Sequence, residues 1–264
     1  MGVLRDIDET QAPLMDHLIE LRGRLLRSVF VLAVAFGVCF YFADQILAFL
    51  AQPLLDAFGD GQARLIYTKL PEVFFVELKV ALFAAFCVSF PFIANQLWAF
   101  VAPGLYAREK KAFLPFLLAT PVLFVAGASL AYFVVMPTAF RWFLGFGGDA
   151  GGIPIEALPS AGDYLSLVMQ FILAFGICFL LPVLLLLLER AGLVTRASLV
   201  KVRRYVIVGV VGLAAVVTPP DPGSQLILAV PLYFLFEGSL LVMLILQRRD
   251  RAEKGEESEA SETV

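Results

Sequence analysis

The sequence contains few of the residues from which active sites are usually built. It has one histidine and three cysteines in 264 residues. His17 precedes the first apolar run, which excludes a serine–histidine pair or a histidine metal cluster inside a membrane. Cys39, Cys87 and Cys178 lie within apolar runs and lack CxxC spacing, so we interpret them as packing residues. Because a glycine-rich phosphate loop is also missing, we expect no enzyme, no cofactor and no metal site.

Charged residues are scarce as well. They make up 16% of the chain, whereas 60% is hydrophobic, and the mean hydropathy is +0.87. One soluble core of this length cannot bury so much apolar surface. We also expect no nucleic-acid partner. A helix needs about 20 apolar residues to cross a bilayer. The sequence therefore predicts an all-α membrane protein with six transmembrane helices, at residues 25–42, 74–102, 113–136, 164–188, 205–217 and 226–246.

Lysine and arginine predict the orientation of these helices. Sixteen of the twenty lie before or at the start of the first run, between the second and third, between the fourth and fifth, or after the sixth. Since cytoplasmic loops carry such an excess, both termini of this multi-pass protein should be cytoplasmic. We expect a flexible N-terminus (residues 1–12), a membrane domain (13–247) and a disordered acidic cytoplasmic tail (248–264).

Two features predict that the bundle is concave rather than built of straight rods. Prolines interrupt several runs and tend to kink helices; they are Pro91, Pro115, Pro121, Pro182 and Pro231. The fifth run is so short that its partner, the sixth, should bring Glu237 level with Arg204 and Tyr205, near the cytoplasmic mouth. Glu237 would be paired or wetted there; the other interpretation is a buried glutamate satisfied by neighbouring helices.

Two glutamates lie beside basic residues at the predicted cytoplasmic ends of the runs. Glu20 belongs to an amphipathic segment that feeds the first span, and Glu109 stands between Arg108 and Lys110. Each glutamate could form an ordinary surface ion pair, in the case of Glu20 with Arg24 four residues on. Their spacing alone does not show whether the two carboxylates come together.

Several motifs follow one another in a fixed order. They are HLIELRGRLLRS, WAFVAPGLYAREKK, AYFVVMPTAF, DYLSLVMQFILAFG, and TPPDPGSQ followed by PLYFLFE. This succession resembles the TatC family, the six-span core subunit of the bacterial twin-arginine protein translocase. The resemblance covers residues 13–247 and omits only the extreme N-terminus and the acidic tail.

The resemblance implies a receptor for folded proteins whose signal peptides carry paired arginines. The family's arginine-binding glutamates correspond to Glu20 and Glu109; Phe100 and Pro103 would shape the site, and Arg22 would hold the helix of Glu20. The chemistry agrees, because guanidinium forks onto a carboxylate with two hydrogen bonds whereas lysine offers a point charge.

The resemblance also implies TatA-like and TatB-like single-span partners. The chain would self-associate in a larger complex, surrounded by the lipid of the bacterial inner membrane, and export would be driven by the protonmotive force. Residues 205–217, rich in small side chains, correspond to the TatB docking surface. Family positions linked to partners or function are Pro53 in the first outer loop, Thr218, Asp221 and Gln225 in the outer turn, and Glu237.

The chain departs from the family pattern at Leu180, where members often have a polar residue ahead of the proline that is Pro182 here. Gln170, on the same predicted helix, is a candidate substitute, although helix packing explains it equally simply. A polytopic transporter of a small solute is the alternative function, but such proteins usually contain internal repeats, and none is found.

Overall fold

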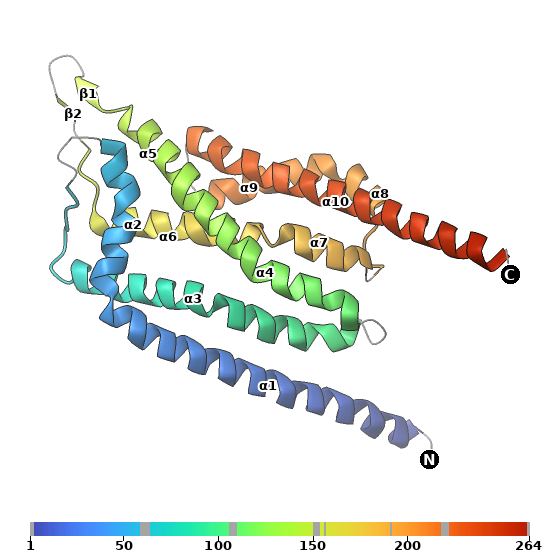
Figure 1. Ribbon diagram of the computed structural model, residues 1–264. Coiled ribbons are helices and arrows are strands. Elements are labelled where there is room, and N and C mark those ends of the chain that lie inside the picture. Colours follow the sequence, from blue (N-terminus) through green and yellow to red (C-terminus); the bar gives the residue numbers. More distant parts are fainter. Residues whose placement is uncertain are drawn as a thin grey trace. The chain divides into compact units, whose positions relative to one another are not determined.

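The computed structural model describes residues 3–58, 64–105, 110–149, 154–155, 157–190, 192–217 and 222–262. For residues 3–14, 16, 101–105, 110–117, 148–149, 154–155, 224 and 249–262 it describes the backbone only. The chain is helical over most of this length (Figure 1). The helices are α1 (Val3–Tyr41), α2 (Ala43–Phe58), α3 (Glu72–Leu105), α4 (Lys110–Leu130), the π-helix η1 (Ala131–Val135), α5 (Met136–Leu144), α6 (Ala161–Cys178), α7 (Leu181–Arg190), α8 (Arg196–Lys201), α9 (Arg203–Val217) and α10 (Pro222–Glu262). Two short strands, β1 (Gly148–Asp149) and β2 (Pro154–Ile155), pair antiparallel.

The prediction of an all-α membrane protein is confirmed. Within the described ranges, five helical stretches of 24 to 30 residues have the length and hydropathy to cross a membrane: His17–Tyr41, Glu72–Phe100, Leu118–Leu144, Ala161–Arg190 and Gln225–Arg248. They correspond to five of the six predicted runs. The remaining run forms α9, a helix of 15 residues, which falls below the roughly 20 residues that a full crossing requires.

Large apolar side chains cover the outer surfaces of these stretches. Val88, Phe133 and Phe234 are 70%, 68% and 67% exposed. Such exposure would be costly in water but is neutral in lipid, where the surroundings are as apolar as the side chain. The chain is therefore a multi-pass membrane protein, as its composition predicts.

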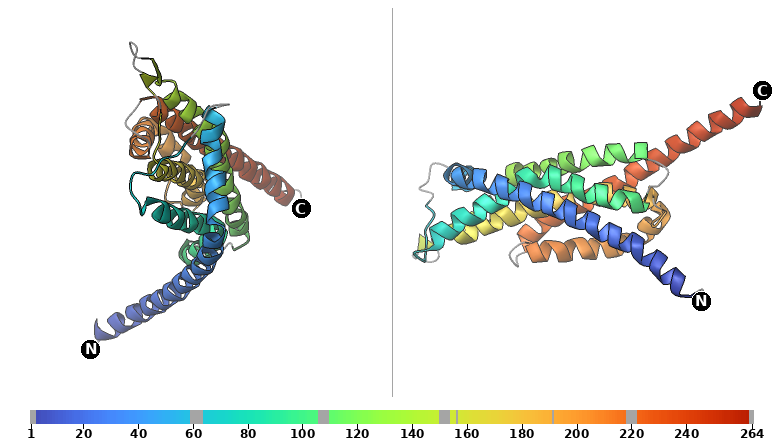
Figure 2. Two further views of the ribbon diagram at one scale, coloured as in Figure 1. Left: turned by 90° about the vertical axis from the view of Figure 1, so that its left-hand side faces the viewer. Right: turned by 90° about the horizontal axis from the view of Figure 1, so that it is seen from below.

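One compact unit comprises Met1–Gln52, Leu65–Pro121 and Ser160–Leu165. Its main feature is the pairing of α1 with α3, which lie side by side (Figures 1 and 2). Cys39 packs there against Ala81 and Ala85, and both alanines are completely buried. Small side chains let two membrane helices approach closely, so the interpretation of Cys39 as a packing residue is confirmed.

Glu72, the first residue of α3, ties together one end of this unit. Its Oε2 accepts hydrogen bonds from the backbone N–H of Thr68 (2.7 Å), the Thr68 hydroxyl (3.1 Å) and the N–H of Lys69 (3.2 Å). Its Oε1 accepts from the Ser160 hydroxyl (2.7 Å) and from the N–H of Gly162 (3.1 Å). The carboxylate thus joins the segment before α3 to the first turn of α6.

The second compact unit comprises Pro53–Arg64, Val122–Pro159 and Ser166–Val264. In this unit α10 packs against α5, α7, α8 and α9. Helices α4 and α6 meet at two glycines. A Cβ added at Gly127 would lie 2.5 Å from the carbonyl oxygen of Phe175, and one added at Gly176 would lie 2.6 Å from the Phe124 ring. Only glycine fits at these two positions without a shift of the neighbouring groups.

Two of the spans are interrupted near prolines. The π-helix η1 precedes α5, which has Pro137 in its first turn. Residues 179–180 separate α6 from α7 just before Pro182, because proline lacks the N–H that would continue the helical hydrogen bonds. Pro231 lies inside α10.

The connection between the first two predicted spans contains a helix, α2, that was not predicted. Pro53 lies inside α2 and is buried, not in a loop. At the chain ends, α1 begins at Val3 and α10 extends to Glu262. The flexibility of residues 1–12 and 248–264 stays a prediction.

Candidate functional site

Glu20 lies on a polar face of α1. Its Oε1 accepts hydrogen bonds from Nη2 (2.6 Å) and Nε (2.9 Å) of Arg24, one turn further along the helix. The ordinary i,i+4 ion pair predicted from spacing is therefore present. In the described part of the chain, Oε2 of Glu20 accepts no hydrogen bond, so the carboxylate retains acceptor capacity for another cation.

The same face of α1 contacts the last turns of α3. The His17 ring stacks on Phe100, with ring centroids 4.1 Å apart and planes 18° from parallel. Arg24 Nη1 lies 3.5 Å from Oε1 of Gln96. Residues 17, 20 and 24 share one helix face, so Glu20 lies between two contacts that fix α1 against α3.

The other residues implied by the resemblance are placed less completely. Arg22 is exposed and has no hydrogen-bond or ion-pair partner among the described residues. Pro103 belongs to α3, of which only the backbone is described at that position. Glu109 belongs to residues 106–109 and lies outside the described residues. It directly precedes α4, which begins at Lys110.

Glu237 is the centre of a second polar cluster, between α9 and α10. Its Oε2 accepts a hydrogen bond from Arg203 Nη2 at 2.7 Å, and its Oε1 accepts one from the Tyr233 hydroxyl at 2.8 Å. Arg203 is the first residue of α9. Glu237 is therefore paired at the start of the short helix, as predicted, and its position near the cytoplasmic mouth stays a prediction.

The predicted outer-turn residues are partly placed. Gln225, near the start of α10, donates a hydrogen bond through Nε2 to the carbonyl oxygen of Val211 in α9 (3.1 Å). Thr218 and Asp221 lie outside the described residues. Leu180 lies in the break between α6 and α7, where its N–H donates to the carbonyl oxygen of Ile177 (3.0 Å).

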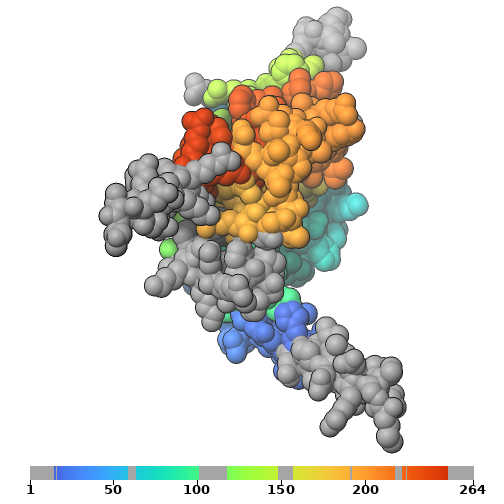
Figure 3. Space-filling model, turned by 90° about the vertical axis from the view of Figure 1, so that its right-hand side faces the viewer, coloured from blue at the N-terminus to red at the C-terminus, as the bar shows by residue number. Residues whose placement is uncertain are grey.

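The face of α9 carries exposed apolar residues next to small ones. Tyr205, Val208 and Val216 are 62%, 70% and 79% exposed, and no atom lies within 4 Å of a Cβ built at Gly209 or Gly212. The surface of this part of the chain is orange in the space-filling view of Figure 3. A second helix could approach this face closely.

Several residues of these clusters were not predicted from the sequence. Arg203 and Tyr233 hold Glu237, and Gln96 and His17 line the face of Glu20. Arg203 could have been predicted, because an ionisable residue within a membrane helix needs a partner and Arg203 belongs to the basic segment that precedes the fifth run. No sequence pattern indicated Gln96, because its role depends on the register between α1 and α3.

These observations define a multi-pass α-helical membrane protein. Among the described residues, no group of three or more histidine, cysteine, aspartate or glutamate side chains could hold a metal ion. The family model described as Sec-independent protein translocase protein (TatC) matches residues 16–231. The chain belongs to the TatC family.

Individual relatives agree with this assignment. TatC of Magnetococcus marinus is 49% identical over 252 residues, which cover 96% of this chain and 91% of the relative. TatC of Aquifex aeolicus is 36% identical over 241 residues, covering 90% and 98%. A crystal structure of the twin arginine translocase receptor TatC superposes with a TM-score of 0.76 at 36% identity and covers 87% of this chain and 98% of that one. The protein is thus a translocase component, and the small-solute transporter gains no support.

Proposed function

We propose that this chain is the receptor of the twin-arginine translocase and binds the paired arginines of export signals through Glu20 and Glu109. The observation that carries the proposal is the position of Glu20 on the face of α1 that contacts the end of α3. Glu109 follows Phe100 by only nine positions in the chain, and nine residues span at most about 30 Å. Chain connectivity therefore allows both carboxylates to reach one pair of arginines.

The proposed topology has six spans with both termini in the cytoplasm. The 15 residues of α9 rise about 22 Å at ~1.5 Å each, less than the roughly 30 Å hydrocarbon core. The bilayer would be thinner beside α9, or the outer turn would lie below the surface. In this orientation Glu20, Glu109 and Glu237 are all near the cytoplasmic face, where the positive-inside excess lies.

Partner subunits and the energy source complete the proposed function. The open face of α9, with Gly209 and Gly212 uncovered, would receive a TatB-like single-span helix, and TatA-like subunits would join the assembly. Pro53, Thr218, Asp221 and Gln225 would support these contacts. Export of the folded cargo would draw on the protonmotive force, with this chain binding and organising rather than catalysing.

Discrimination between paired arginines and paired lysines tests the receptor function. Purified chain should retain a signal peptide with Arg-Arg about tenfold better than the same peptide with Lys-Lys, because only guanidinium donates two parallel hydrogen bonds to each carboxylate. Fluorescence anisotropy of labelled peptides on detergent-solubilised protein measures the two affinities. Equal affinities would contradict the proposal, since the peptides carry the same charge.

Removal of the resident cation of Glu20 should strengthen binding. In an Arg24→Gln variant the Glu20 carboxylate is free and one positive charge near the peptide is gone, so the affinity for the Arg-Arg peptide should rise about two- to fivefold. Arg27→Gln is the matched control, because Arg27 is exposed and three residues further along the same helix. Weaker binding in Arg24→Gln alone would instead mean that Arg24 holds Glu20 in its working position.

A further inference from the structure

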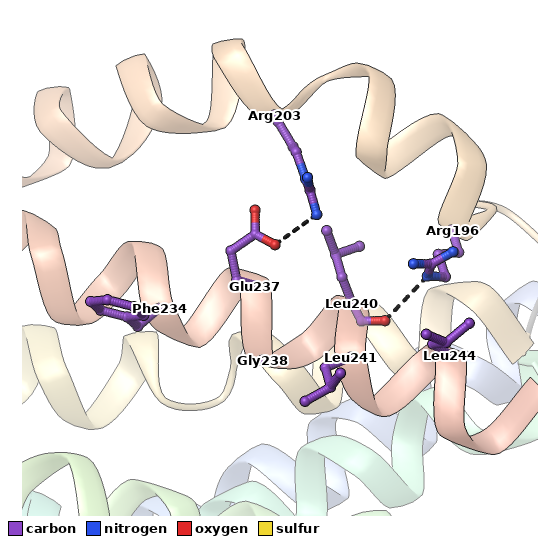
Figure 4. A pocket seen from close by; sticks show the side chains of 8 residues that line it. All are labelled: Arg196, Arg203, Phe234, Glu237, Gly238, Leu240, Leu241 and Leu244. Atoms are coloured by element: carbon purple, nitrogen blue, oxygen red, sulfur yellow. Dashed lines mark hydrogen bonds and ion pairs between the residues drawn. The ribbon is translucent and has the colours of Figure 1, made fainter.

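A pocket of about 400 Å³ opens between α8, α9 and α10, beside the ion pair of Arg203 and Glu237. Figure 4 shows its two kinds of lining: arginines from α8 and α9 on one side, and one face of α10 on the other. The volume is within the range of about 300–1,000 Å³ that small-ligand sites occupy. All its described walls belong to the second compact unit.

The polar wall retains unused cationic capacity. Arg196 Nε donates a hydrogen bond to the carbonyl oxygen of Leu240 (3.3 Å), and Arg203 donates through Nη2 to Glu237. A guanidinium has five N–H donors, so each arginine retains donors beyond these bonds. Two arginines and one glutamate leave the pocket with a net positive charge.

A capping box fixes the backbone of α8 at Arg196. Thr195 and Ser198 form a capping box, in which the Thr195 side chain accepts from the Ser198 N–H and the Ser198 side chain accepts from the Thr195 N–H, each at 3.2 Å. Arg196 is the first residue after this cap. A pre-positioned cation loses less side-chain freedom when an anion arrives.

The second wall is apolar and open. Phe234 and Leu241 line the pocket from α10 and are 67% and 58% exposed. They lie on one face of a helix that has the length and hydropathy of a membrane span. Between them, Gly238 presents no side chain, and a Cβ built there meets nothing within 4 Å. The pocket therefore offers a cationic end and an apolar channel that opens where lipid chains would lie.

We infer that this pocket binds an anionic phospholipid, with the phosphate on Arg196 and Arg203 and an acyl chain along Phe234, Gly238 and Leu241. Charge complementarity selects this occupant, because the Arg-Arg segment of a signal peptide would be repelled by the same arginines. Basic pockets between membrane helices on the cytoplasmic side bind anionic headgroups in this way; that location rests on the proposed orientation.

Native mass spectrometry of the full-length chain in detergent tests the inference with phosphatidylglycerol and phosphatidylcholine of identical acyl chains. Phosphatidylglycerol should bind at least several-fold more tightly, and Arg196→Gln should weaken it about tenfold through loss of a charge-assisted hydrogen bond. Arg204→Gln is the matched control, since it removes the same charge from a neighbouring residue that does not line the pocket; it should leave the affinity unchanged.

A variant that fills the apolar part of the pocket tests the inference independently. Gly238→Leu keeps both arginines and favours the helix, but its side chain would occupy the channel and should also abolish the phosphatidylglycerol adduct. Equal binding of the two lipids, or equal losses in Arg196→Gln and Arg204→Gln, would overturn the inference. So would a co-purified protein adduct that Gly238→Leu removes while lipid binding persists, because the pocket would then receive a partner helix.

Discussion

Glutamine in place of Glu20 or Glu109 is expected to weaken binding of an Arg-Arg signal peptide about tenfold for each substitution. The change preserves the shape of the side chain and removes only its charge, so the loss measures the pairing with guanidinium. Titration of a labelled peptide against purified variants gives the affinities. If the two carboxylates contact the same arginine pair, the loss of affinity in the double variant will differ from the product of the two single losses, because neighbouring sites couple.

Glu189→Gln is the control for this experiment. Glu189 is a glutamate at the end of α7 that accepts a hydrogen bond from Gln247 of α10, and the proposed orientation places it at the same membrane face. Its replacement should leave peptide affinity unchanged. A similar loss in all three single variants would indicate a general effect of negative charge at this surface and would contradict a specific site.

Alanine at Gly176 or Gly127 is expected to destabilise the fold by about 1–3 kcal/mol, because the added methyl overpacks a close helix contact. The two positions should respond differently to a second change. At Gly176 the obstacle is the ring of Phe124, whereas at Gly127 it includes the backbone oxygen of Phe175. Phe124→Leu should therefore rescue Gly176→Ala and leave Gly127→Ala unrescued.

Apparent melting temperatures in detergent measure both effects. Gly209→Ala is the matched control, since nothing lies within 4 Å of a Cβ at that position and alanine favours the helix relative to glycine. Melting temperatures of Gly176→Ala and Gly127→Ala that equal that of Gly209→Ala would show that the α4–α6 contact is looser than described.

Much of this architecture follows from the sequence because the bilayer imposes simple constraints. Five of the six spans predicted from the apolar runs are helices of membrane length, and the ion pair of Glu237 with Arg203 agrees with the pairing that the short fifth run predicted. Helix α2 was not predicted because its 16 residues are too few, and too mixed in composition, to form a span. Proline at position 53 also argued against a helix there.

The candidate site could be predicted only in part. Spacing along α1 predicted the pair of Glu20 with Arg24, because residues four apart on a helix are neighbours. The contacts of this face with Gln96 and Phe100 depend on how α1 and α3 pack, which no local pattern encodes. For the same reason, the hydrogen bonds from Ser160 and Gly162 to Glu72, which span 88 and 90 positions of the chain, left no signal in the sequence.

The arrangement around Glu72 also determines which side chains that position can accept. Backbone N–H groups point at both of its oxygens, Gly162 at Oε1 and Thr68 and Lys69 at Oε2. A side-chain amide would set its own NH₂ against a main-chain donor whichever way it turned. Glutamine therefore cannot replace the carboxylate at position 72. Neither a flip of the amide nor rotation of the neighbouring hydroxyls would remove the donor–donor clash.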